Sequence, residues 1–275
     1  MRQRPRRRLG RRGILLIVVV IVLAALGGVI AVVWLGGGSK PVSTEEAEER
    51  FHEGRTTGPQ PGSRLRPAEG VYTYRGSGTE HISVPPKSQD QGPVMPATVT
   101  HGRDGCWTFR IDYSTNHWQD WIYCSKNGRL EEHGGQTFQR WDFVVTSIES
   151  VSKFTCDPPA IAIKPAMKPG QTWRQSCEGT TTDVEGVGVS SGTYRFVGLE
   201  QVKVAQHRVD AYHFVQERTL KGAQTGSQRA DLWFGTDGLP LRNERQVKVD
   251  TDTAVGAVTY TEEGVFQLAE LRPKT

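Results

Sequence analysis

The longest apolar stretch of the chain lies near its N-terminus and predicts a membrane span. Residues 14–35 contain no charged side chain, and the indole of Trp34 is their one hydrogen-bonding side chain. As a helix, this run would extend about 33 Å, which is enough to cross a hydrocarbon core of about 30 Å. A cleaved signal peptide has a shorter apolar core. We therefore favour a retained signal anchor over cleavage at residues 35–39.

The charges on either side of this run predict its orientation. Residues 1–13 carry seven arginines, and cationic flanks stay on the cytoplasmic side. We therefore expect a single-pass protein of the inner (plasma) membrane, with residues 36–275 in the extracytoplasmic space of a cell envelope. Without the arginine-rich arm, the chain keeps 27 Lys and Arg against 30 Asp and Glu. This balance excludes a basic nucleic-acid-binding domain.

Residues 36–69 predict a flexible juxtamembrane tether. They are rich in glycine, proline, serine and charged residues, a composition that keeps a chain extended and solvated. Ser43 and Glu46 have the spacing of a capping box, and Gly54 suits a helix end. The tether is thus expected to contain one short helix.

From residue 70 onward, hydrophobic and polar positions alternate with the period of β-strands. Residues 71–74, 106–113 and 246–249 are clear examples, and no later segment shows an apolar stripe at helical period. Glycine and proline interrupt the pattern nearly every ten residues. The pattern predicts a single antiparallel all-β domain over residues 70–275.

Two parts of this domain resemble each other. Residues 70–76 read like residues 192–198, and each half contains an aromatic strand that ends in an Asn-Gly or Asp-Gly turn. Two duplicated meanders joined by residues 158–179 would explain the similarity. The alternative is that all β-meanders share their turn chemistry.

The register of one hairpin can be read from the sequence. In one antiparallel register of residues 106–124, aromatic residues face one another, opposite charges oppose each other and two cysteines meet: Trp107 with Tyr123, Phe109 with Trp121, Arg110 with Asp120, and Cys106 with Cys124. A slip by one residue would destroy all of these matches.

The four cysteines predict two disulfides, because an even number of cysteines in an oxidising compartment usually pairs. The hairpin register pairs Cys106 with Cys124 and leaves Cys156 with Cys177. Zinc ligation is the rival interpretation, but no two cysteines lie within five residues of each other. We expect no metal and no cofactor.

The sequence offers only weak candidates for catalysis. Residues 188–192, with Ser190 and Ser191, match the G-x-S-x-G pattern of a hydrolase, but that device needs a helix after the serine. Residues 193–197 predict a strand, so a flexible turn is the better interpretation.

Two groups of possible metal ligands, Glu131 and Glu132 beside His133, and Asp112 with His117, lack a partner at diagnostic spacing. We therefore expect a protein that is not an enzyme, and a surface hydrolase stays a remote alternative.

Aromatic residues are concentrated between residues 107 and 141. Most of them are expected to fill the core, whereas some line a ligand groove or a partner surface, where tryptophan and tyrosine are enriched. The candidates for ligand or partner contact are Trp118, Trp121, Trp141 and Trp233.

Residues 230–242, with the sequence ADLWFGTDGLPLR, resemble a strand–turn–strand of the LolA/LolB-like superfamily. Residues 200–215 resemble the strand pair that precedes it, so that the resemblance covers about residues 195–270. It implies an open antiparallel half-barrel or strongly curved sheet, whose concave face holds acyl chains or a segment of a partner. The helices that form the lid in that superfamily have no counterpart in this sequence.

These observations together predict a membrane-anchored, extracytoplasmic, non-catalytic binding module that holds a lipid-like ligand or an envelope protein. The alternative is a structural or assembly component of an envelope complex.

Overall fold

The computed structural model describes residues 39–53, 58–143, 146–182, 184–253 and 256–275. The chain divides into two compact units. One consists of residues 38–141 and 149–275 and contains the β domain. The other consists of residues 1–37 and 142–148, and most of it lies outside the described residues.

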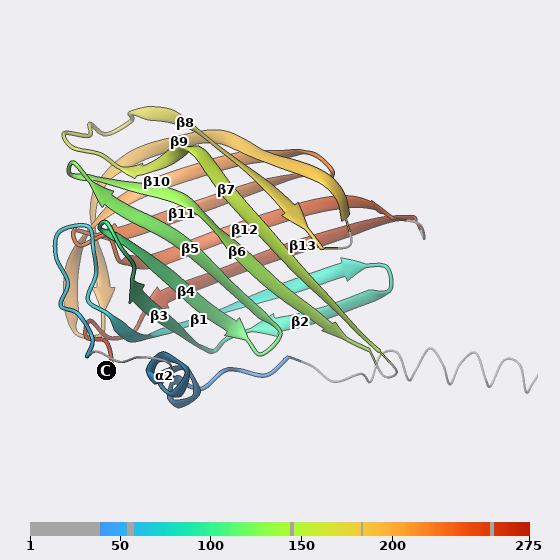
Figure 1. Ribbon diagram of the computed structural model, residues 1–275, viewed down its shortest axis with the longest axis horizontal. Helices are drawn as coiled ribbons and strands as arrows, with labels where there is room; N and C mark the ends of the chain where they lie inside the picture. Colours follow the sequence, from blue (N-terminus) through green and yellow to red (C-terminus); the bar gives the residue numbers. More distant parts are fainter. Residues whose placement is uncertain (1–38, 54–57, 144–145, 183, 254–255) are drawn as a thin grey trace, which may run out of the picture. The chain divides into compact units, whose positions relative to one another are not determined.

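The β domain is a meander of long strands with one short helix beside it (Figure 1). The helix is α2, Thr44–His52. The strands are β1 Gly70–Ser83, β2 Pro86–Gln91, β3 Val94–His101, β4 Cys106–Ser114, β5 His117–Lys126, β6 Arg129–Asp142, β7 Ser147–Ile163, β8 Thr172–Thr181, β9 Val184–Val204, β10 His207–Gly222, β11 Thr225–Gly235, β12 Pro240–Thr253 and β13 Gly256–Leu268.

The sheet closes into a barrel, so the prediction of an open half-barrel is wrong. The last strand, β13, pairs with β1 in antiparallel register from Tyr74–Leu268 to Ile82–Tyr260. On its other edge, β1 pairs first with β3 and then with β2. In the described part of the chain, twelve strands therefore form the ring, and β2 lies on the same edge of β1 as β3, further along that strand. Closure removes the exposed edges that an open sheet would leave unpaired.

The ring does not divide into two meanders, so the predicted duplication finds no counterpart in the architecture. Consecutive strands are neighbours around one continuous sheet. Residues 158–179, predicted to join two meanders, contain the end of β7 and the start of β8. Residues 188–192, predicted to form a flexible turn, lie within strand β9.

The predicted hairpin register and both disulfides are confirmed. Strands β4 and β5 pair as expected from Cys106–Cys124 to Asp112–Trp118, and a register shift follows before the turn. The disulfide Cys106–Cys124 joins directly opposite residues. The second disulfide joins Cys156 of β7 to Cys177 of β8.

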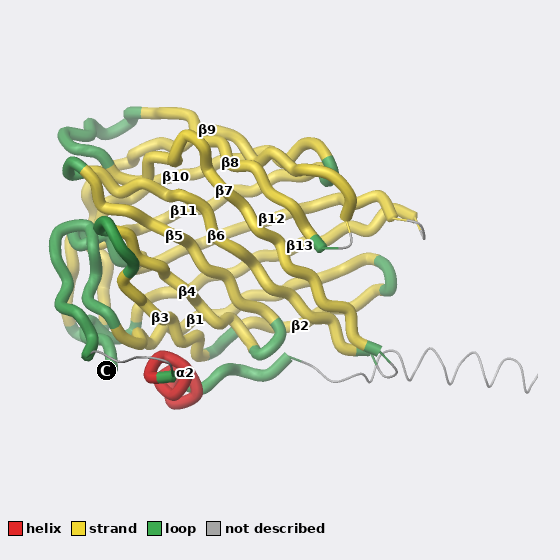
Figure 2. The backbone as a smooth tube through the Cα atoms, viewed as in Figure 1, coloured by secondary structure: helices red, strands yellow, loops and turns green. Residues whose placement is uncertain are grey.

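Helix α2 packs on the outer face of the barrel instead of lying in a solvated tether (Figure 2). The capping box is present: the Ser43 hydroxyl accepts from the Glu46 amide, and the Glu46 carboxylate accepts from the Ser43 amide. Ala47 and Phe51 pack against Val71 of β1. The tether prediction counted charges but overlooked these apolar residues, which lie on one face of the helix.

Because α2 depends on its cap, we expect Ser43→Ala to loosen the helix from the barrel. Loss of an N-cap side chain costs about 1 kcal/mol, which corresponds to about fivefold faster amide hydrogen exchange across residues 44–52. The control Ser176→Ala, at an exposed position of β8, should leave exchange in α2 unchanged. Equal exchange in the two variants would contradict the role of the cap.

One end of the barrel is filled by the segment that precedes β1. Leu65 has a left-handed backbone conformation, with φ of 57°, and its side chain belongs to the main hydrophobic core. Its carbonyl accepts a 3.1 Å hydrogen bond from the indole nitrogen of Trp107. Inside this end, the core consists largely of aromatic residues from many strands.

No helix in the described part of the chain has the length and apolarity needed to cross a bilayer. The predicted span, residues 14–35, and the arginine-rich arm, residues 1–13, lie outside the described residues.

Candidate functional site

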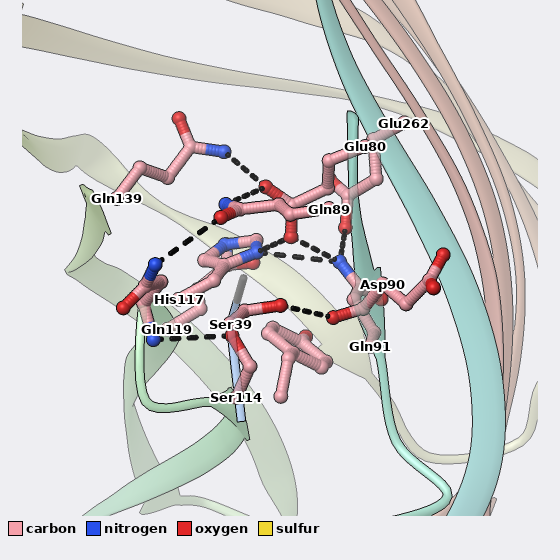
Figure 3. A network of polar contacts seen from close by, with 12 residues as sticks. Ser39, Glu80, Gln89, Asp90, Gln91, Ser114, His117, Gln119, Gln139 and Glu262 are labelled. Atoms are coloured by element: carbon pink, nitrogen blue, oxygen red, sulfur yellow. Dashed lines mark hydrogen bonds and ion pairs between the residues drawn. The ribbon is translucent and has the colours of Figure 1, made fainter. Parts of the chain in front are cut away.

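The barrel interior contains a layer of buried and half-buried polar side chains, which we call the polar layer (Figure 3). It forms because several strands place a polar residue in the phase that points into the barrel; Glu80, for example, has the phase of the buried Ile82, and Tyr113 that of the buried Ile111. Its members are Glu80, Gln89, Gln91, Tyr113, His117, Gln139, Arg245, Tyr260 and Glu262.

Two buried carboxylates organise this layer. Glu80 accepts from Nδ1 of His117 at 2.6 Å and from Nε2 of Gln91 at 2.8 Å. The same amide nitrogen of Gln91 lies 2.6 Å from Oε1 of Glu262, and Arg245 forms an ion pair with Glu262. Glu262 therefore has a cationic partner and Glu80 a histidine partner, and both also accept from the neutral amide of Gln91, as buried carboxylates require.

The environment of Glu80 lowers its pKa. Burial alone would raise this pKa, but the positive charge of His117 and the hydrogen bonds from His117, Gln91 and Gln89 outweigh it. The charged form of Glu80 is thus the form that the folded barrel stabilises.

This pKa shift predicts how a Glu80→Gln variant responds to pH. A group whose pKa is lowered on folding contributes stability above its unfolded value, here 4.5, and the contribution is lost as the pH falls through the folded value. We expect the variant to be less stable than the wild type at pH 7, by at least about 1.5 kcal/mol.

The deficit should shrink as the pH falls below 4.5. Urea unfolding of both proteins between pH 3 and pH 7 measures it. A deficit that is constant across this range would contradict the ion pair.

The polar layer is a poor metal site. Glu80, His117 and Glu262 offer three ligand atoms within 4.8 Å of one another, a set that suits a divalent cation. However, Gln91 and Arg245 already donate to these carboxylates, and a cation would have to displace them. A second group, Glu132 with Cys156 and Cys177, offers no thiolates because the cysteines form a disulfide.

Beside the polar layer, the barrel contains a partly open cavity of about 200 Å³. One part of its lining is aromatic and includes Phe109, Trp121, Tyr123, Tyr194, Phe234 and Phe266. The other part is polar and includes Gln119, Glu132, Gln216, Arg218 and Asn243. The cavity therefore combines an apolar surface with a hydrogen-bonding surface, as ligand sites do.

A buried ion pair balances the charge of this cavity. Arg218 lies 3.6 Å from Glu132 and donates to Gln175 at 2.9 Å. Burial raises the pKa of Glu132, although the Arg218 guanidinium opposes the shift. The pair as a whole adds no net charge when Glu132 is ionised.

Two polar atoms of the cavity lining have no hydrogen-bond partner among the described residues: the hydroxyl of Tyr194 and Oδ1 of Asn243. The Tyr194 side chain is 1% exposed and the Asn243 side chain 6%. Burial raises the pKa of Tyr194 well above its usual value, so the phenol keeps its proton and can donate. A buried polar atom without a partner is costly.

The predicted contact tryptophans do not come together. Trp121 lines the cavity, and Trp141 is buried, with its ring against Tyr260. Trp118 is half-buried between the side chains of Arg110 and Phe138. Trp233 alternates with cavity residues, and its ring stacks on His213.

The candidate catalytic serine and the candidate metal ligands Asp112 and His117 do not form a site either. Ser190 lines the cavity, but strand β9 continues past it without the helix that a nucleophile elbow requires. Asp112 forms ion pairs with Arg50 and Arg110, whereas His117 belongs to the polar layer.

The sequence analysis missed most of the interior polar residues. A usable signal exists: Glu80 has the same strand phase as Tyr72 and Tyr74, and Arg218 has the phase of Phe214. A charged residue in the phase of buried aromatics predicts either a buried ion pair or a site.

No known family model matches the chain, and no curated protein matches it. Among solved structures, the chain is similar to the hypothetical lipoprotein YmcC from Escherichia coli (K12), with 11% identity over 74% of this chain and 85% of that chain, and a TM-score of 0.35. So low a TM-score carries no argument about function.

Proposed function

We propose that the barrel is a non-catalytic binding module, which holds one small, uncharged amphiphilic molecule in its interior. The observation that carries this proposal is that two residues of the cavity lining, Tyr194 and Asn243, each have a buried polar atom without a hydrogen-bond partner among the described residues, in a cavity lined by both aromatic and polar side chains. A hydroxyl group suits both atoms, because it accepts from the phenol and donates to the amide oxygen.

The size and charge of the cavity narrow the ligand class. A cavity of about 200 Å³ is smaller than the 300–1,000 Å³ typical of sites for drug-sized ligands. It suits a short-chain or single-ring molecule better than a whole lipid. When Glu132 is ionised, the Glu132–Arg218 pair carries no net charge, and an anionic ligand would then add an uncompensated buried charge.

The proposed location is the extracytoplasmic side of an envelope membrane. The two disulfides support an oxidising compartment, and the sequence of residues 1–35 supports export. The envelope association and the ligand-holding role proposed from the sequence are kept here, whereas the proposed ligand becomes smaller.

Tryptophan quenching by a bromine-labelled probe tests this function, because Trp121 lines the cavity. We expect 6-bromohexan-1-ol to quench the fluorescence of the full-length protein saturably, and 6-bromohexanoate to bind more weakly. Tyr194→Phe should lower the affinity for the alcohol by about 3- to 10-fold, the value of one hydrogen bond.

Trp121→Phe provides the control, since it removes the fluorophore next to the proposed ligand. The saturable component should disappear in this variant, while collisional quenching of the other tryptophans persists. Quenching that never saturates, and that is the same in the wild type and in both variants, would contradict the proposal.

A further inference from the structure

Strands β7 and β8 are joined by backbone hydrogen bonds over only part of their length. The two strands pair only from Ser152–Thr181 to Thr155–Glu178. Beyond these residues, β7 continues to Ile163, while β8 extends back to Thr172 and pairs with β9. Among the described residues of the two strands, no ladder pairing joins residues 156–163 to residues 172–177.

Side chains close this part of the wall in place of backbone hydrogen bonds. The indole nitrogen of Trp173 and the side-chain amide nitrogen of Gln175 both donate to the backbone carbonyl of Ile161, each at 2.7 Å. The Cys156–Cys177 disulfide lies where the ladder stops. A side chain leaves its position by a rotamer change, which takes picoseconds to nanoseconds for an exposed residue, whereas a ladder must be unzipped.

The cavity lies directly inside this stretch of wall. Phe154 and Ala162 of β7 and Cys177 of β8 all belong to its lining. The side-chain amide oxygen of Gln175 accepts from Arg218 at 2.9 Å. The Gln175 side chain is therefore also linked to the Glu132–Arg218 ion pair of the cavity. Leu65 and the main hydrophobic core occupy one end of the barrel axis.

From this geometry we propose that the ligand enters the cavity sideways, between β7 and β8, through a portal that Trp173 and Gln175 close. The inference rests on the proposed binding function. The Cys156–Cys177 disulfide closes residues 156–177 into a covalent ring, with a sequence separation of 21, and it thereby limits how far the portal opens. The other disulfide, Cys106–Cys124, lies within an intact ladder and has no such role.

Stopped-flow quenching with 6-bromohexan-1-ol tests the portal on the full-length protein. In the variant C156S/C177S we expect the association and the dissociation rate constant each to rise by at least fivefold. A wider entrance alters the barrier in both directions. In the matched control C106S/C124S both rate constants should equal those of the wild type.

A second variant keeps the test decisive if C156S/C177S fails to fold. Trp173→Phe removes one of the two donors to Ile161 but keeps the disulfide and all residues of the cavity lining. We expect it also to accelerate both rate constants, by about threefold or more, whereas Trp118→Phe on the β4–β5 pair should not.

The two proposals fail in different ways. If the probe binds with unchanged rate constants in C156S/C177S and in Trp173→Phe, the portal is wrong and the binding function stands. If the probe does not bind the wild type saturably, the proposed binding function is wrong, and the proposed portal is then wrong as well.

Discussion

Replacing Arg245 by methionine is expected to destabilise the barrel by about 3–5 kcal/mol, because it leaves a buried carboxylate without its cation. Arg245 is 6% exposed and forms an ion pair with Glu262, which is 7% exposed. Its guanidinium also donates to Gln119 at 3.1 Å and lies 4.1 Å from the centre of the Tyr113 ring. Methionine fills much of the same volume but replaces none of these interactions.

Equilibrium urea unfolding at pH 7, followed by near-ultraviolet circular dichroism, measures this loss. The double variant R245M/E262Q is the matched control, since it removes both charges and leaves only neutral hydrogen-bonding groups. We expect it to recover at least half of the stability that R245M loses. If R245M loses less than about 1 kcal/mol, or if the double variant is worse than the single one, the ion pair does not hold the polar layer together.

The parts of the fold that could be predicted from the sequence depend on neighbours in the chain. The β4–β5 register was predictable because a short turn joins the strands, and because Cys106–Cys124 and Arg110–Asp120 are opposite pairs of recognisable chemistry. The cap of α2 was predictable for the same reason, since Ser43 and Glu46 are three residues apart.

Closure of the sheet could not be predicted, because it joins the first strand to the last. The pairing of Gly78 with Gly264 spans nearly the whole domain, and alternation in either strand is the same whether its edge is paired or free. The resemblance to an open half-barrel then supplied the wrong answer. Local sequence determines which face of a strand points inward, but not what lies beside its edge.

The interior site was missed for a related reason. Trp121 was a candidate because tryptophan is enriched at contacts, whereas Tyr194 and Asn243 have no distinctive spacing in the sequence. They become notable only when strands β9 and β12 are placed around one cavity and their polar atoms are found without partners. The sequence identifies residues of unusual chemistry, but an unmet hydrogen bond is a property of the assembled barrel.

A single methyl group at Gly192 is expected to damage both the fold and the cavity. A Cβ atom at this position would lie 2.7 Å from the Cα atom of Arg218 and even closer to the carbonyl oxygen of Glu217. These are backbone atoms of β10, held in register with β9 by the ladder, so they cannot move aside as a flexible side chain would. We expect Gly192→Ala to cost about 3 kcal/mol, the upper part of the usual range for overpacking.

Gly198 offers a matched control in the same strand. A Cβ atom there meets no atom within 4 Å, so Gly198→Ala should change the free energy of unfolding by less than about 1 kcal/mol, and in the stabilising direction because it restricts the unfolded chain. Urea unfolding of the two variants measures the contrast, and equal stability would contradict the close approach of β9 to β10.

The same substitution also reaches the proposed site. Ser190, Tyr194 and Arg218 all line the cavity beside Gly192. Displacing β9 from β10 therefore separates the Tyr194 hydroxyl from the Glu132–Arg218 pair. Gly192→Ala should thus weaken the binding of 6-bromohexan-1-ol in the fraction that remains folded, whereas Gly198→Ala should leave that affinity unchanged. Retained affinity in both variants would show that the close β9–β10 contact matters for stability alone.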